Sequence, residues 1–80
     1  MLSTNYAVLY DFARNMKTIR IEKNISLVKL ANLTGLHINF LCKVEKAQSN
    51  PSLYSMYKIA TALNIRLIDL LDVRDIIFDI

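Results

Sequence analysis

The chain has 80 residues, of which 54% are hydrophobic, and its sequence contains one cysteine and one histidine. A chain of this length forms one domain and buries only about 60% of its unfolded surface, so we expect marginal stability. A single cysteine excludes an internal disulfide, and one cysteine with one histidine cannot form a zinc cage. We therefore predict no metal site and a reducing environment.

Membrane and secretion signals are missing from the sequence pattern. No uncharged apolar run approaches the roughly 18 residues that a membrane-spanning helix needs, and the first residues, MLSTNYAVLYDF, lack the positive region of a signal peptide. We therefore predict a cytoplasmic protein with no membrane contact.

The net charge of +3 is unevenly distributed along the chain. Residues 14–58 contain eight basic and two acidic residues, whereas residues 59–80 contain two basic and four acidic residues. Either these charges solvate helix faces, or the basic middle and the acidic, apolar end form two surfaces with different partners.

Helix signals dominate the first part of the chain, and strand signals are weak. A first helix is predicted to begin after Thr4 or Asn5 and to end near Lys23, where Asn24 can adopt the left-handed conformation. Its apolar residues recur at intervals of three and four: Leu9, Phe12, Ala13, Met16 and Ile19.

Shorter helices are predicted for the rest of the chain. Ser26 is expected to cap a second helix that ends at Gly35, and a third helix covers about residues 38–45. Ser52 caps a fourth helix that Asn64 closes. A fifth covers roughly residues 67–72, and residues 73–80 either extend it or leave it. The sequence thus predicts one all-α domain of five helices over residues 1–80.

The third predicted helix is amphipathic. At about 100° per residue, Leu41 and Val44 point almost the same way, which we interpret as the core direction. Asn39, Lys43 and Lys46, at spacings i, i+4 and i+7, lie on the opposite face. Two readings remain open: a helix that reads DNA, and a core helix that shares its spacing.

The outward strip has side chains suited to a major groove. Asparagine can pair bidentately with adenine, lysine can donate to guanine, and apolar side chains such as Ile38 and Phe40 can contact a thymine methyl. His37, at the expected cap position, can donate to a phosphate or a base. The residues predicted to contact the DNA backbone or flank the bases are Ser26, His37, Phe40, Lys46, Gln48, Ser49 and Asn50.

Two short helices joined by a glycine turn inside a five-helix frame are a stronger signal than the third helix alone. The most specific residues are Arg20, Leu30-Ala31, Gly35, Leu41, Val44-Glu45, Asn50-Pro51-Ser52-Leu53, Ile59-Ala60 and Leu63. With these residues, the chain from about Phe12 to Asp72 resembles the Cro/C1-type helix-turn-helix family of phage-repressor-like regulators. The resemblance implies a five-helix DNA-binding domain with the helix-turn-helix at its second and third helices.

The resemblance also assigns roles to individual residues. The base-reading positions fall on Ile38, Asn39 and Lys43, two of which the helical spacing also places outward. The family's pairing of a first-helix arginine with a recognition-helix glutamate falls on Arg20 and Glu45, which implies a partly buried structural ion pair.

Three residues depart from the family pattern. Leu27 stands where the family commonly has a glutamine that anchors a phosphate, and Ile38 stands where a polar or basic residue is frequent. Ala47 stands where glycine is usual, at an expected cost of about 1 kcal/mol if the left-handed backbone is kept.

The end of the chain is rich in large apolar residues. Ile68, Val73, Ile76, Ile77 and Phe78 either cover the core of their own subunit or pair with a second copy. We predict a homodimer through these residues, because a two-fold dimer spaces two recognition helices by about 34 Å, one turn of DNA. The expected target is then a pseudo-palindrome.

The sequence therefore predicts a dimeric, sequence-specific regulator of transcription that binds double-stranded DNA, for instance a phage or plasmid repressor or a restriction–modification controller. The alternative is a protein-interaction module of the same fold, antitoxin-like or anti-repressor. No nucleophile constellation and no phosphate-cradling glycine loop occur in the sequence, so we predict neither an enzyme nor a cofactor.

Overall fold

The computed structural model describes residues 2–72, with side chains from residue 7 onward. This part of the chain contains helices and no strand, as the sequence predicted. The helices are α1 (Leu2–Glu22), α2 (Leu27–Thr34), α3 (Ile38–Glu45), α4 (Leu53–Ala62) and α5 (Leu67–Leu70). None of these helices is long and apolar enough to cross a membrane.

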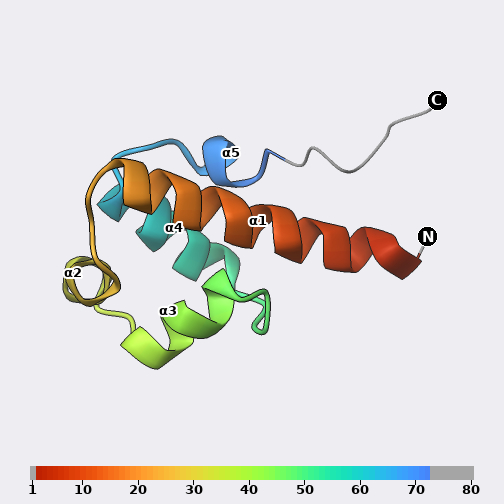
Figure 1. Ribbon diagram of the computed structural model, residues 1–80, viewed down its shortest axis with the longest axis horizontal. Coiled ribbons are helices and arrows are strands. Elements are labelled where there is room, and N and C mark those ends of the chain that lie inside the picture. The colour runs from red at the N-terminus through yellow and green to blue at the C-terminus, as the bar shows by residue number, and fades with distance from the viewer. Residues whose placement is uncertain (1, 73–80) are drawn as a thin grey trace.

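The helices pack around one hydrophobic core. In Figure 1, α5 lies on one side of the long α1, α3 lies on the other side, and α4 passes behind α1. Helix α2 contacts α3 and α4, α4 contacts α5, and α1 contacts both α3 and α5. The five helices therefore surround the core in a closed ring of contacts. Every helix contributes to this core, whose buried members are Phe12, Met16, Leu30, Leu41, Val44, Ile59, Ala60, Leu63 and Leu70.

Helix α1 begins at Leu2, earlier than the predicted cap at Thr4 or Asn5. Exposed N–H groups in the first turn of a helix can bond to water, so the helix does not require a capping side chain there. Toward its other end, α1 follows the predicted periodicity, because Phe12 and Met16 are buried.

Two short helices begin at serine side-chain caps. The Ser26 hydroxyl accepts a hydrogen bond from the Lys29 N–H, and the Ser52 hydroxyl accepts one from the Ser55 N–H, each at 3.0 Å. A cap of this kind stabilises a helix by typically about 1 kcal/mol, which matters for helices of eight to ten residues. The predicted starts of α2 and α4 are confirmed.

Three helices, α1, α3 and α4, are followed by a residue other than glycine with left-handed backbone. Asn24 (φ 59°), Ala47 (φ 57°) and Asn64 (φ 58°) each follow a helix, and the next residue donates its N–H back into the last turn. Asparagine adopts this conformation readily. Ala47 keeps the conformation for which glycine is suited, so the predicted strain is present at the end of α3.

The turn between α2 and α3 is fixed from both sides. Gly35 has φ 75° and donates its N–H to the Ala31 carbonyl at 2.8 Å. Buried Thr34 donates its hydroxyl to the Leu30 carbonyl at 2.8 Å and accepts the Leu36 N–H at 3.1 Å. These bonds satisfy the backbone groups of a three-residue connection and set the angle at which α3 leaves α2.

Helix α5 ends at Leu70, two residues before the predicted end. The amide of Asn15 in α1, which is nearly buried, donates to the carbonyls of Leu70 at 3.1 Å and Asp72 at 3.0 Å. Because α1 supplies donors to these carbonyls, the chain can leave the helix early without burying unpaired polar groups.

Candidate nucleic-acid interface

Helix α3 separates an inner face from an outer face. Leu41 and Val44 are 0% and 1% exposed and belong to the core, whereas Asn39, Lys43 and Lys46 are exposed. The structure therefore brings the three outward residues together on one accessible strip, as the helical spacing predicted.

The apolar residues of α3 lie at the borders of this strip. Ile38, Phe40 and Cys42 are half-buried, and Phe40 packs against the core. Their apolar atoms are thus shared between the interior and the rim of the strip, and they do not cover Asn39 or Lys43.

An ion pair joins α3 to α1. The Arg20 guanidinium donates to both carboxylate oxygens of Glu45, at 2.6 and 3.1 Å, and a third bond of 2.8 Å reaches the Ile25 carbonyl just before α2. The two side chains are 13% and 7% exposed. Arg20 and Glu45 thus form the pair that their positions predicted, and Arg20 also positions the start of α2 relative to the end of α3.

His37 caps α3 with its Nδ1 atom, which accepts the Asn39 N–H at 3.1 Å. When Nδ1 accepts, Nε2 is the ring nitrogen that donates, so the exposed side chain can still offer a hydrogen-bond donor outward. His37 therefore orders the first turn of α3 and offers a donor beside Asn39.

The predicted flanking residues surround the outward strip. Ser26, Lys46, Gln48 and Asn50 are exposed, and Ser49 is half-buried. The Ser26 hydroxyl is already engaged in the α2 cap. Lys46, Gln48, Ser49 and Asn50 lie at the end of α3 and in the loop to α4. Ala47, with its left-handed backbone, turns the chain within this loop.

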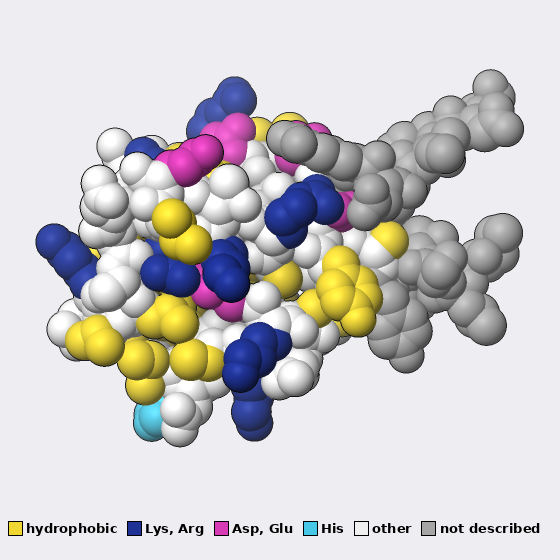
Figure 2. All heavy atoms as spheres, in the orientation of Figure 1, with side chains coloured by type: hydrophobic (Ala, Val, Ile, Leu, Met, Phe, Trp, Pro, Cys, Tyr) yellow, Lys and Arg dark blue, Asp and Glu magenta, His cyan; other side chains and the backbone are white. Residues whose placement is uncertain are grey.

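Charge on the surface follows the uneven charge of the sequence. Figure 2 shows Lys and Arg side chains over α1 and α3, while Asp and Glu side chains lie mainly toward α5, where further Lys and Arg side chains stand beside them. The acidic residues there include Glu22, Asp69 and Asp72, which line a hollow of about 220 Å³ between α1 and α5. The outward strip of α3 thus belongs to the basic side of the molecule.

Of the predicted dimer contacts, only Ile68 can be placed. Its side chain is 63% exposed on α5. Val73, Ile76, Ile77 and Phe78 lie outside the described residues.

Sequence reasoning missed an apolar groove on another part of the surface. A hollow of about 320 Å³ between α2 and α4 is lined by Leu33, Tyr54 and Tyr57, which are 53%, 66% and 57% exposed, and by Lys58. The Lys58 ammonium lies 4.9 Å from the centre of the Tyr54 ring. The sequence could have indicated this groove, because Tyr54 and Tyr57 lie outside the core-facing stripe of α4.

Comparisons with known proteins agree with this geometry. The chain is 36% identical over 50 residues to the HTH-type transcriptional regulator SutR of Escherichia coli, and 35% identical over 52 residues to the control protein C.SmaI of Serratia marcescens. These matches cover 62% and 65% of the chain, but only 28% of SutR and 62% of C.SmaI. The chain thus spans less than two thirds of either relative.

Solved structures resemble most of this chain. The restriction–modification controller protein C.AhdI of Aeromonas hydrophila has a TM-score of 0.76 at 37% identity, covering 78% of this chain and 94% of C.AhdI. The hypothetical transcription factor NHTF of Neisseria has a TM-score of 0.77 at 31% identity, covering 80% and 74% of the two chains.

The family model described as "Helix-turn-helix" (HTH_3) matches residues 16–70, which run from the middle of α1 to the end of α5. This range contains both the turn at Gly35 and the braced helix α3. The chain belongs to this Cro/C1-type helix-turn-helix family.

Proposed function

We propose that the protein is a transcriptional regulator that binds double-stranded DNA sequence-specifically. The observation that carries this proposal is the arrangement of α3, which buries Leu41 and Val44 and leaves Asn39 and Lys43 exposed. An α-helix fits the major groove, where these two side chains can pair with base edges. Family membership and the names of the relatives support the same function.

The proposed division of roles follows from position on α3. Ile38, Asn39 and Lys43 read bases, because they lie on or beside the outward strip. Phosphate and flanking contacts come from the start of α2, the cap of α3 and the loop after it: Ser26, His37, Phe40, Lys46, Gln48, Ser49 and Asn50. Arg20 and Glu45 act on DNA indirectly, by holding α3 in place.

Selection from a random pool of duplex oligonucleotides tests this function. We expect an enriched pseudo-palindromic site, whose affinity falls steeply as salt rises because phosphate contacts release counterions. Fluorescence anisotropy at increasing salt measures that dependence. If no site is enriched and no salt-sensitive binding occurs, the protein is not a DNA-binding regulator.

The proposed regulator is a homodimer, with exposed Ile68 at the interface. A two-fold dimer presents two copies of α3 to successive turns of the duplex, about 34 Å apart. Light scattering should give twice the mass of one chain, and Ile68→Asp should give the mass of one chain. Ile21→Asp is the matched control, since Ile21 is also exposed, on α1. A wild-type mass of one chain would exclude the dimer.

A narrower proposal is that the protein controls a restriction–modification system or another adjacent operon. Its support is the likeness to C.SmaI and to C.AhdI, a controller protein that the chain covers almost completely. Nuclease protection of the DNA upstream of its own gene tests this role. A protected pseudo-palindrome there is expected, and an unprotected promoter excludes the narrower role alone.

The alternative is a protein-interaction module, for which an exposed apolar side chain such as Phe40 on α3 would be needed. That side chain is half-buried and packs against the core, so it offers little free apolar surface. The groove beside Tyr54 and Tyr57 is the feature that now favours the alternative. If a stable complex with another protein requires Tyr57 while the selection enriches no DNA, the alternative replaces the regulator.

A further inference from the structure

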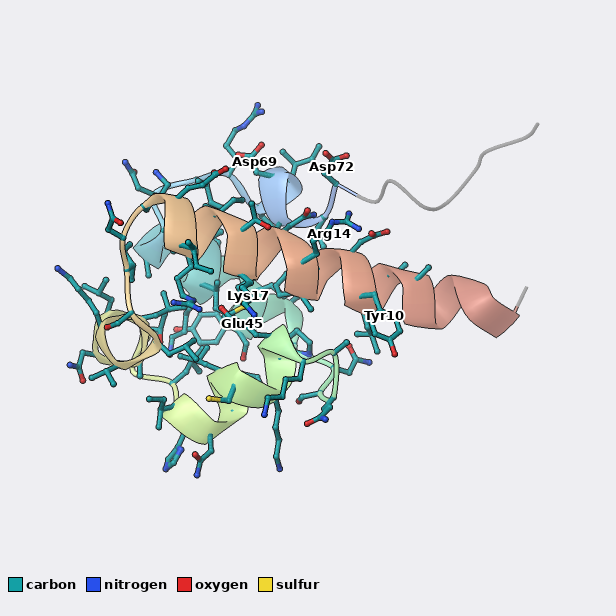
Figure 3. All side chains as sticks on the ribbon, viewed as in Figure 1. Tyr10, Arg14, Lys17, Glu45, Asp69 and Asp72 are labelled. Atoms are coloured by element: carbon teal, nitrogen blue, oxygen red, sulfur yellow. The ribbon has the colours of Figure 1, made fainter. Side chains whose placement is uncertain are left out.

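A small hollow lies beside α3, on the side that faces α1. Its volume is about 240 Å³, and its lining residues are Lys17, Arg20, Leu27, Cys42, Glu45 and Lys46. Figure 3 shows Lys17 and Glu45 between α1 and α3. The hollow therefore joins the middle of α1, the first residue of α2 and the end of α3, next to the strip formed by Asn39 and Lys43.

The hollow carries excess positive charge. Arg20 and Glu45 neutralise each other through their two short hydrogen bonds. Lys17 and Lys46 are both exposed, and within the described part of the chain neither forms an ion pair. Two lysines, one in α1 and one at the C-cap of α3, thus line the same hollow.

The position of Lys17 is set by the ion pair next to it. Lys17 lies three residues before Arg20, so the two side chains share a face of α1. Because Arg20 holds Glu45, and Lys46 directly follows Glu45, the ion pair keeps the backbone at Lys46 next to the part of α1 that carries Lys17. The Leu27 side chain is aliphatic and Arg20 is bound to Glu45, so Lys17 and Lys46 are the cationic side chains of the lining that remain to meet an anion.

From this geometry we propose that Lys17 and Lys46 together bind one phosphodiester of the DNA strand that runs beside α3. The inference rests on the proposed function, in which α3 enters the major groove. The walls of that groove are the phosphate backbones, so residues flanking a reading helix meet phosphates. A lysine ammonium is a compact charge on a flexible stem and is suited to this contact. Lys17 is thus a DNA contact supplied by α1, outside the helix-turn-helix itself.

The test compares Lys17→Ala with Lys23→Ala, both in the full chain. Lys23 is exposed at the end of α1 and does not line the hollow, so the control removes the same charge from the same region. Anisotropy titrations use the selected site and an unrelated duplex over a range of salt concentrations. Loss of one phosphate contact lowers the slope of log affinity against log salt by about 0.9.

We expect Lys17→Ala to lower that slope by less than one unit on both duplexes, because Lys46 still contacts the shared phosphate, without changing the ratio of the two affinities. Lys23→Ala should leave the slope at the wild-type value. The double variant Lys17→Ala/Lys46→Ala should lower the slope by about 0.9, the loss of one phosphate, and should lose more affinity than the sum of the single variants, because each lysine partly replaces the other.

Two results overturn the inference while the proposed function stands: equal slopes for Lys17→Ala and Lys23→Ala, or a change in base preference in Lys17→Ala. Additive losses in the double variant would assign the two lysines to separate phosphates, which contradicts the shared site. If the wild-type protein binds neither duplex, the proposed function itself fails. Circular dichroism of each variant confirms that the compared proteins are folded.

Discussion

The inner and outer faces of α3 differ in how their side chains are held. On the inner face, Leu41, Val44 and Glu45 are enclosed, and Glu45 is bound at two points by Arg20. On the outer face, Asn39 and Lys43 are exposed. One helix of eight residues thus carries buried, braced side chains on one face and exposed polar side chains on the other. Substitutions on the inner face should therefore change the free energy of unfolding, and substitutions on the outer face should change the preference for DNA bases.

The largest expected effect comes from breaking the inner face with Glu45→Ala. Removing the carboxylate leaves the nearly buried Arg20 guanidinium without its partner, which should lower the free energy of unfolding by about 3–5 kcal/mol. Urea denaturation followed by circular dichroism measures this loss. Glu22→Ala, an exposed glutamate on α1, is the control and should change stability by less than about 0.5 kcal/mol. A similar effect of both variants would show that the ion pair does not hold α3.

A substitution on the outer face should leave the stability nearly unchanged and lower the discrimination between DNA bases. Lys43→Ala removes an exposed donor, so we expect the free energy of unfolding to change by less than about 0.5 kcal/mol. Discrimination at one base pair of the selected site should fall by about 1–3 kcal/mol. Competition binding with single-base variants of the site measures it. Unchanged discrimination would remove Lys43 from the base-reading set.

The smallest expected effect is at the end of α3, where the two faces meet the following loop. Ala47→Gly relieves the left-handed strain and should raise the free energy of unfolding by up to about 1 kcal/mol, less the entropy that glycine adds to the unfolded chain. Asn64→Gly is a useful comparison, because asparagine tolerates the same conformation at the end of α4. Ala47→Gly should therefore stabilise the protein more than Asn64→Gly does. Equal changes in thermal denaturation would argue against strain at Ala47.

Local signals in the sequence predicted most of the helices. Ser26, Ser52, Asn24 and Asn64 act within three residues of the helix ends that they determine, so their effect can be read from the sequence alone. The spacing of Leu41 and Val44 likewise predicted which face of α3 is buried.

Features that depend on distant residues could not be predicted in the same way. The early end of α5 involves Asn15, which is 55 positions away from its partner Leu70. The hollow at Lys17 requires the packing angle between α1 and α3, whereas the periodicity of α1 identifies only its core face. The groove beside Tyr54 and Tyr57 similarly arises where α2 and α4 meet.

The proposed function depends most on Asn39, which is exposed on α3 and which we propose reads a base of the bound duplex. The most direct measurement is the affinity of the wild-type protein and of Asn39→Ala for every single-base variant of the selected site. We predict that the variant loses about 1–3 kcal/mol of preference at one position in each half-site and retains its preference at the other positions. If Asn39→Ala has the same base preferences as the wild-type protein, or loses affinity equally at all positions, Asn39 does not read a base.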